Sequence, residues 1–158
     1  MIIGGVAGGA STAARLRRLD EQAEIILFEK GEYISYANCG LPYYIGGVIE
    51  ERERLFVQTP ESFKARFNIE VRIKSEVKAI EPENKQVVIK DWATGKTYRE
   101  SFDKLVLSPG AEPVLPPWEG IRTEGIFTLR NVADTDRIKA WAGRQEVKKA
   151  VVVGAGFI

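Results

Sequence analysis

A glycine-rich turn near the start of the chain constrains the fold more than any other feature. The apolar residues Met1-Ile2-Ile3 precede the run Gly4-Gly5-Val6-Ala7-Gly8-Gly9. In a Gly-x-Gly-x-x-Gly spacing Val6 takes the middle position, so we expect Gly5 and Gly8 to supply the close backbone approach that Val6 does not. Glycine here permits a tight turn and lets backbone N–H groups and the positive end of the next helix reach a pyrophosphate. Alone, the pattern fits a plain strand-to-helix turn equally well.

An acidic residue at the expected distance favours the nucleotide interpretation. The apolar run 25–28 ends at Glu29, twenty residues beyond Gly9. A carboxylate at the end of that strand can accept the hydroxyl groups of a ribose. The order of strand, glycine turn, helix, strand and acid predicts an α/β, Rossmann-like dinucleotide-binding domain with a parallel sheet.

Residues 10–19 are predicted to form the helix after the turn, and their alanines permit close packing on the sheet. Ser11, Arg15 and Arg18 are spaced to share one face of this helix. One interpretation is a solvated stripe whose arginines suit the C-terminal end of the helix dipole. The other is a docking strip for a substrate that carries phosphate groups.

Cys39 is the single cysteine of the sequence, which contains no histidine. A lone cysteine is often a small buried apolar residue. Here Gly40 follows it and Pro42 suits the first turn of a helix, so the sulfur is predicted to lie at a helix N-terminus. The positive end of the helix dipole favours the thiolate and makes the sulfur a nucleophile. With one thiol and no histidine, we expect no metal site, and acid or base groups must come from elsewhere.

The middle of the chain is predicted to be a helix followed by strands. Thr59 is expected to cap a short helix with Pro60 at its first position and Phe63 and Phe67 on its inner face. Four strands are predicted after it, at residues 69–73, 76–80, 86–91 and 96–101. The last two form a hairpin, and together the strands are expected to make an antiparallel β-meander beside the parallel sheet.

The segment 103–111 indicates another buried strand, which runs into a turn at Gly110-Ala111. Such a turn at the carboxyl end of a strand is where an open α/β sheet meets its ligand, although a purely structural turn explains it equally well. Three prolines follow and make a stiff connection, Pro113, Pro116 and Pro117. We therefore place the first segment of the nucleotide-binding domain at residues 1–112.

The end of the sequence repeats the opening theme. Residues 113–148 are expected to be a linker and a helix, the helix running over 132–149, with Ile138 and Trp141 inward. Residues 150–153 then form a predicted strand before Gly154-Ala155-Gly156. We interpret residues 149–158 as the truncated start of a second Rossmann unit, because a strand and half a phosphate loop cannot form a domain.

Charge and hydropathy exclude several classes of protein. The 23 basic and 22 acidic residues are spread along the chain and leave a net charge of +1, so no basic stripe indicates nucleic acid. No apolar run approaches the roughly 20 residues that cross a bilayer, and no signal peptide precedes the first strand. We expect a cytoplasmic protein with neither a membrane nor a nucleic acid as its partner.

With both fingerprints in place, the sequence resembles the pyridine nucleotide-disulfide oxidoreductases over essentially all of its 158 residues. It is similar to the single-cysteine branch, which includes coenzyme A-disulfide reductase, NADH oxidase and NADH peroxidase. The motif that carries the finer likeness is Ser35-x-x-Asn38-Cys39-Gly40-Leu41-Pro42-Tyr43. It looks most like coenzyme A-disulfide reductases and the related CoA persulfide or polysulfide reductases, of which the chain would be roughly the first third.

The resemblance assigns roles to particular residues. It implies FAD on the first fingerprint, NADH or NADPH on the second, and Cys39 as the redox-active residue beside the flavin. The FAD contacts would be Gly4, Gly5, Val6, Ala7, Gly8, Gly9, Glu29, Lys30, Val77, Gly110 and Ala111. The start of the NAD(P)H site would be Gly154 and Gly156, and the contacts to coenzyme A would be Ser11, Arg15, Arg18, Ser35 and Asn38.

Two departures from the family pattern narrow the chemistry. Dithiol members carry a second cysteine five positions after the first, where this chain has Tyr44. Cys39 must therefore pair with a partner outside this segment, which the resemblance implies is coenzyme A in a mixed disulfide. Peroxidase-like members place a histidine in the first glycine loop, where this chain has Ala7, and this argues against peroxide as the substrate.

Two alternatives stay open at this point. A related NADH oxidase would cycle Cys39 through a sulfenic acid. A non-catalytic nucleotide-binding or redox-sensing module would end near Ile158. For the chain alone, we expect weak FAD binding at best and no NAD(P)H turnover, and for the full-length protein a homodimer.

Overall fold

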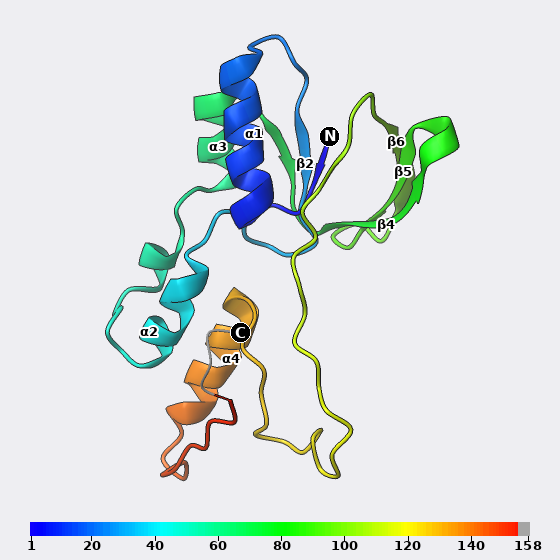
Figure 1. Ribbon diagram of the computed structural model, residues 1–158. Coiled ribbons are helices and arrows are strands. Elements are labelled where there is room, and N and C mark those ends of the chain that lie inside the picture. Colours follow the sequence, from blue (N-terminus) through cyan, green and yellow to red (C-terminus); the bar gives the residue numbers. More distant parts are fainter. Residues whose placement is uncertain (155–158) are drawn as a thin grey trace. The chain divides into compact units, whose positions relative to one another are not determined.

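The computed structural model describes residues 1–154. Contacts between residues divide the chain into two compact units, and each is described by itself. The first unit comprises Met1–Ala37 and Glu53–Ala111, and the second comprises Asn38–Arg52 and the residues from Glu112 onward. The helices and strands that build them are labelled in Figure 1.

A four-stranded sheet forms the centre of the first unit. Its strands are β1 (Ile2–Ile3), β2 (Ile26–Phe28), β3 (Glu70–Arg72) and β7 (Val106–Leu107), in the order β3-β2-β1-β7. Each neighbouring pair is parallel. The predicted α/β class with a parallel, Rossmann-like sheet is therefore confirmed.

The side chains of β2 point alternately to the two faces of this sheet. Leu27 joins a core with Ala13 of α1 (Ala7–Leu19) and Phe63 of α3 (Pro60–Phe67), and these two helices lie side by side in Figure 1. Ile26 and Phe28 join a second core with β5 (Gln86–Asp91). The parallel sheet is thus covered by helices on one face and by strands on the other.

Both helices of the first unit begin at identifiable residues. α1 begins at Ala7 rather than at residue 10, because the glycines of the turn form its first turn and the Ala10 N–H already donates to the Val6 carbonyl at 3.2 Å. α3 begins with the predicted Thr59 cap, where the Thr59 hydroxyl accepts from the Ser62 N–H and the Ser62 hydroxyl accepts from the Thr59 N–H.

The predicted four-stranded meander has three strands. They are β4 (Ser75–Glu81), β5 and β6 (Thr97–Ser101), paired antiparallel in that order, and the β5–β6 hairpin is confirmed. The first predicted strand, 69–73, belongs instead to the parallel sheet as β3, because Ile69 is fully buried against the α1–α3 core. Lys74, with φ 51°, turns the chain between β3 and β4.

Arg72 links the two sheets of the first unit. Its guanidinium donates to the carboxylates of Glu70 and Glu100, each at 2.6 Å, and to the Tyr98 hydroxyl at 3.3 Å. Burial by itself lowers the pKa of Arg72, but these hydrogen bonds outweigh it and raise the pKa above the ordinary arginine value. Arg72 therefore stays charged and holds β6 against the edge strand β3.

The second unit contains a 3-10 turn (Asn38–Gly40), the short helix α2 (Leu41–Ile45) and the helix α4 (Val132–Ala142). Asn131 and Asp134 form a reciprocal capping box at the start of α4. The helix does not reach residue 149 as predicted, because Gly143 caps it and glycine is a poor helix former.

The predicted strand at 150–153 does not form within the described residues, and this is a second correction. Val151, Val152 and Val153 are exposed at 88%, 83% and 76%. A strand needs a hydrogen-bonding neighbour, and none of residues 1–154 pairs with this run. A search of the described part of the chain finds no helix of the length and hydropathy that crossing a membrane requires.

Candidate functional site

The glycine turn of the first unit has geometry that only glycine tolerates at two positions. Gly4 has φ +95°, and a Cβ on it would lie 1.9 Å from the Ser108 carbonyl oxygen. A Cβ on Gly9 would lie 1.7 Å from the Gly4 carbonyl oxygen. Both contacts are with backbone, which cannot move aside as a flexible side chain can. The turn therefore draws β1, the start of α1 and the end of β7 into close contact.

Glu29 is bound directly to this turn. Its carboxylate accepts the Gly5 N–H through one oxygen and the Gly31 N–H through the other, each at 2.8 Å. The pairing of glycine turn and acid predicted from their spacing is thus present in space. Each carboxylate oxygen has a second lone pair, so Glu29 can still accept a hydroxyl group.

The turn, Glu29 and the segment after β7 follow three neighbouring parallel strands, so all lie at the carboxyl edge of one sheet. Ser108 donates its N–H to the Ile3 carbonyl at 2.8 Å, and its hydroxyl lies 3.2 Å from where a Cβ on Gly8 would be. Gly110, with φ +72°, and Ala111 follow it and are exposed. This is the edge at which open α/β sheets bind ligands.

The start of α1 adds positive potential to this edge. The helix has 13 residues, and neither a side-chain cap nor an acidic residue occupies its first turn. Its first backbone N–H groups are therefore without an intrahelical or side-chain acceptor, which is the arrangement that binds phosphate groups at helix N-termini.

A cavity of about 200 Å³ lies beside the turn, between α1 and α3. It brings together four predicted site residues: Val6 and Ala7 of the turn, Ser11 of α1, and Ser35. The other residues that line the cavity were not predicted to belong to a site. They are Ala10, Ala14, Tyr36, Gln58, Phe63 and Phe67. The predicted inner face of α3 gave a signal for the two phenylalanines, whereas nothing in the local pattern marks Tyr36 or Gln58.

Ser35 is held in an unusual backbone conformation. Its φ of 45° lies in the left-handed region, which is sparsely populated by residues other than glycine. Its N–H donates to the Gly5 carbonyl, and its own carbonyl accepts the Val57 N–H, both at 2.9 Å. These bonds fix Ser35 to the glycine turn and account for the strained conformation.

The arginines of α1 divide into two kinds. Arg15 and Arg18, the predicted docking strip, are exposed, as is Ser11. Arg17, which was not predicted to matter, donates to the Phe67, Asn68, Asp20 and Glu21 carbonyls at 2.6–3.2 Å. Arg17 therefore ties the end of α1 to the end of α3, while Arg15 and Arg18 extend into solvent.

In the second unit, Cys39 is exposed and lies in the 3-10 turn immediately before α2. Pro42 is in the first turn of α2, as predicted, but the helix has only five residues, so its dipole is correspondingly small. The side-chain oxygen of Asn38 is buried without a hydrogen-bond donor among the described residues. The turn thus presents a thiol next to an unsatisfied acceptor.

The remaining predicted residues are placed as follows. Lys30 is exposed, and Val77 is half-buried in β4 against the second core, beside a shift in the register with β5. Gly154 is exposed with φ +85°, while Gly156 lies outside the described residues. Among residues 1–154 no cluster of His, Cys, Asp and Glu could hold a metal ion.

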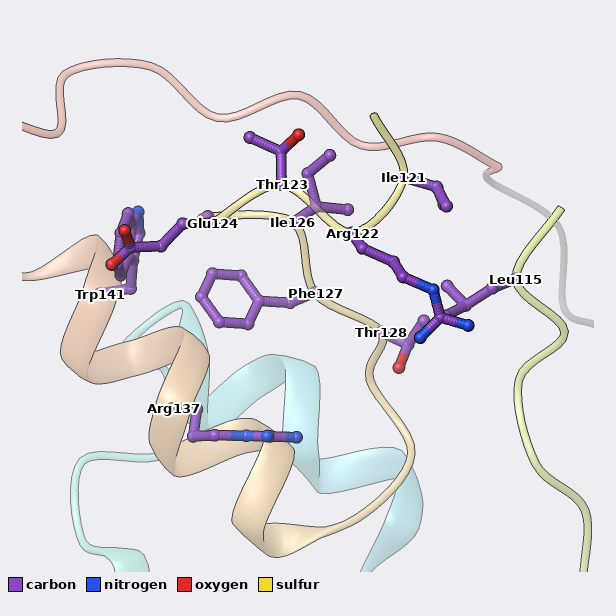
Figure 2. Close-up of a pocket in the computed structure, with 11 residues that line it drawn as sticks. Leu115, Ile121, Arg122, Thr123, Glu124, Ile126, Phe127, Thr128, Arg137 and Trp141 are labelled. Carbon is purple, nitrogen blue, oxygen red and sulfur yellow. The ribbon is translucent and has the colours of Figure 1, made fainter. Parts of the chain in front are cut away.

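A second cavity, of about 340 Å³, lies in the second unit and contains none of the predicted site residues. Figure 2 shows it between the segment 121–128 and α4, which contributes Arg137 and Trp141. The rings of Phe127 and Trp141 meet edge to face at 5.7 Å. Arg137 donates to Asp134 within α4, so its charge is already balanced.

Comparisons with known proteins agree with these observations. The sequence profile of the family described as pyridine nucleotide-disulphide oxidoreductase matches residues 1–158. The chain is 44% identical over 158 residues to proteins named coenzyme A disulfide reductase from Staphylococcus haemolyticus and Staphylococcus aureus. The match covers all of this chain but 35% of each relative.

Solved structures give the same likeness. Each of the three that follow matches 89% of this chain. Reduced Bacillus anthracis CoADR-RHD is 60% identical with a TM-score of 0.88, over 26% of that chain. The NAD-dependent persulfide reductase from A. fulgidus is 37% identical with a TM-score of 0.83, over 26% of that chain. The water-forming NADH oxidase from Lactobacillus brevis is 27% identical with a TM-score of 0.84, over 31% of that chain.

Proposed function

The chain belongs to the pyridine nucleotide-disulphide oxidoreductase family, and we propose that the whole protein is an FAD-dependent NAD(P)H:disulfide oxidoreductase that reduces CoA disulfide. By the whole protein we mean this chain at the full length of its relatives, of which it spans 35%. The observation that carries the proposal is a glycine turn with its acid in one unit and a single exposed cysteine, Cys39, in the other. CoA persulfide or polysulfide is an alternative substrate of the same chemistry.

FAD is the cofactor of this family, and the first unit fits it. The uncapped start of α1 and the turn Gly4–Gly9 suit its pyrophosphate, and Glu29 has lone pairs left for a ribose. We propose that Lys30, Val77, Gly110 and Ala111 complete this side of the site. When bound, FAD accepts a hydride from NAD(P)H and passes two electrons on to a disulfide.

The sulfur chemistry falls to Cys39. Its thiolate attacks one sulfur of CoA disulfide, the substrate S–S bond breaks, and one CoA thiolate leaves. The product is a mixed disulfide between Cys39 and CoA. Two electrons, originally from NAD(P)H, then reduce the mixed disulfide, which frees the second CoA and restores the Cys39 thiolate. An exposed thiol suits this cycle, because it can reach a disulfide that comes from solvent.

We propose that Ser11, Arg15, Arg18, Ser35 and Asn38 bind the coenzyme A moiety. The cavity that Ser11 and Ser35 share and the exposure of Arg15 and Arg18 support this. Guanidinium groups suit phosphates, of which coenzyme A carries several. Asn38 is included because it adjoins the exposed Cys39 in the same turn.

The remaining parts of the proposal rest on the family. We propose that the chain from residue 149 begins the NAD(P)H-binding unit, with Gly154 and Gly156 in its phosphate loop, and that the first FAD-binding segment ends near residue 112. We further propose that the whole protein is a homodimer and works in the cytoplasm.

An oxygen-reducing NADH oxidase is the second candidate, because the Lactobacillus brevis NADH oxidase has a TM-score of 0.84 to this chain. Anaerobic assays separate the two. We expect the whole protein to oxidise NADH or NADPH without oxygen when CoA disulfide is supplied, and to release CoA thiols. Rapid oxygen consumption with no release of CoA thiols would reject our choice in favour of the oxidase.

A further inference from the structure

We infer that Lys139 of α4 is a positioning residue for the Cys39 turn, which it holds in place through Tyr44 of α2. Tyr44 occupies the position at which dithiol relatives carry their second cysteine. The inference rests on the proposed function, because it assigns Lys139 a part in presenting that thiol.

The short helix α2 depends on its neighbours. A helix of five residues forms too few hydrogen bonds to be stable alone. Leu41, the first residue of α2, is only 2% exposed. The helix packs against both α4 and the 3-10 turn that contains Cys39. The conformation of that turn is therefore set by whatever fixes α2 onto α4.

One ammonium group makes two contacts with Tyr44. Lys139 Nζ donates to the Tyr44 carbonyl oxygen at 2.8 Å and lies 3.5 Å from the centroid of the Tyr44 ring. The same carbonyl accepts the Gly47 N–H at 3.3 Å just past the end of α2, so the ammonium adds a second, charged donor to it, and the aromatic face attracts the cation. Lys139 thus caps α2 from a position 95 residues further along the chain.

A second contact with α4 fixes the far end of the segment Asn38–Arg52, which contains the Cys39 turn and α2. Arg52 donates to Asp136 in a forked arrangement, with Nε to Oδ1 at 2.9 Å and Nη2 to Oδ2 at 2.7 Å. Asp136 and Lys139 are one helical turn apart, so they share a face of α4. The segment that begins at Asn38 is therefore attached to α4 at Tyr44 and again at Arg52.

This attachment matters for a single-cysteine cycle. Under the proposed function, Cys39 must meet the substrate disulfide in one half of the cycle and be presented for reduction in the other. Small displacements of a reacting group cost much of its rate. The contacts of the Lys139 ammonium are with Tyr44, so its effect on the thiol is indirect.

Hydrogen exchange of the 158-residue chain tests the attachment of α2 to α4 and needs no enzymatic activity. Lys139→Met keeps most of the stem but removes the donor and the charge. We expect amides 41–49 to exchange about tenfold faster, as the loss of one charged hydrogen bond and one cation–π contact implies. Lys139→Arg, which can donate and stack, should restore protection, and Lys148→Met, an exposed lysine of the same unit, should change nothing. Equal exchange in Lys139→Met and Lys148→Met, or a uniform rise that includes residues 132–142, would overturn the inference.

Steady-state kinetics of the whole protein provide the second readout. We expect Lys139→Met to lower kcat for CoA disulfide about tenfold while KM stays within about twofold, with Lys139→Arg close to the wild type. A Lys139→Arg variant as slow as Lys139→Met would contradict positioning by this contact. Failure of the proposed function would appear differently, as an inactive wild-type protein in which the exchange results still hold.

Discussion

The Glu29 carboxylate accepts the backbone N–H of Gly5 at 2.8 Å, so the acid after the second strand is hydrogen-bonded to the turn after the first. The two residues are 24 positions apart. They meet because β1 and β2 are parallel neighbours, whose carboxyl ends lie at one edge of the sheet. A single bond thus joins the two parts of the predicted nucleotide fingerprint at one edge of the sheet.

The glycine turn should be intolerant of a methyl group at Gly9 and tolerant of one at Gly8. Gly9→Ala places Cβ 1.7 Å from the Gly4 carbonyl oxygen, whereas the Cβ of Gly8→Ala meets only the Ser108 side chain, with Oγ at 3.2 Å and Cβ at 3.4 Å. We expect Gly9→Ala to lower the free energy of unfolding by about 3 kcal/mol or more, and Gly8→Ala by less than about 1 kcal/mol. Urea denaturation of both variants measures this, and equal stabilities would show that the turn is not close-packed.

Removing the charge of Glu29 should weaken the turn. Glu29→Gln replaces one accepting oxygen with an NH₂ group, which cannot accept the N–H of Gly5 or Gly31. We expect a loss of about 1–3 kcal/mol in the free energy of unfolding, because one backbone donor is left without its partner. Glu32→Gln is the matched control, since Glu32 forms an exposed ion pair with Lys74 and should cost at most about 1 kcal/mol. A control as damaging as Glu29→Gln would refute the assignment.

The α1 arginines should separate into structural and functional residues. Arg17→Ala removes four hydrogen bonds to carbonyls and should lower the melting temperature of the chain by several degrees, at about 2–4 °C per kcal/mol lost. Arg15→Ala and Arg18→Ala should leave the melting temperature unchanged.

In the whole protein, Arg15→Ala and Arg18→Ala should instead raise KM for CoA disulfide, and the effect should diminish at high salt, where charge interactions are screened. An unchanged KM in both variants would show that this stripe is only solvated surface.

Cys39 should react in the native chain and be required in the whole protein. Because the thiol is exposed, we expect one thiol per chain to titrate with an aromatic disulfide reagent without denaturant. In the whole protein, Cys39→Ser should abolish CoA disulfide reduction and leave the FAD absorbance in place. Retained activity would show that the thiol is incidental.

Local sequence predicted the parts of the fold that depend on near neighbours. The glycine turn, the Thr59 cap with Pro60, and the β5–β6 hairpin each involve residues within a few positions of one another, and all three are confirmed. The strand at residues 70–72 was predicted but assigned to the wrong sheet, because its partner β2 lies more than 40 residues earlier and pairing at that distance has no local signal. The same reason explains residues 150–153, whose pattern suits a strand but which have no neighbouring strand among the described residues.

The candidate site shows the same division between features that the sequence predicts and contacts that depend on residues far apart in the chain. Glu29 followed from its spacing to Gly9, Ser11 from its helical spacing to Arg15 and Arg18, and Ser35 from the family motif. The left-handed conformation of Ser35 could not be read from the sequence, since serine has no preference for it and hydrogen bonds from distant residues impose it. The contact of Lys139 with Tyr44 spans 95 positions and had no pattern to mark it.

The central claim is that Cys39 transfers electrons from a reduced flavin to CoA disulfide, and the visible spectrum of the whole protein tests it most directly. The FAD-loaded protein is reduced without oxygen, and CoA disulfide is then added. We predict that the oxidised flavin absorbance returns and that two CoA thiols appear for each two electrons used, as thiol–disulfide exchange requires. A flavin that stays reduced, with no CoA thiol released, would contradict the account.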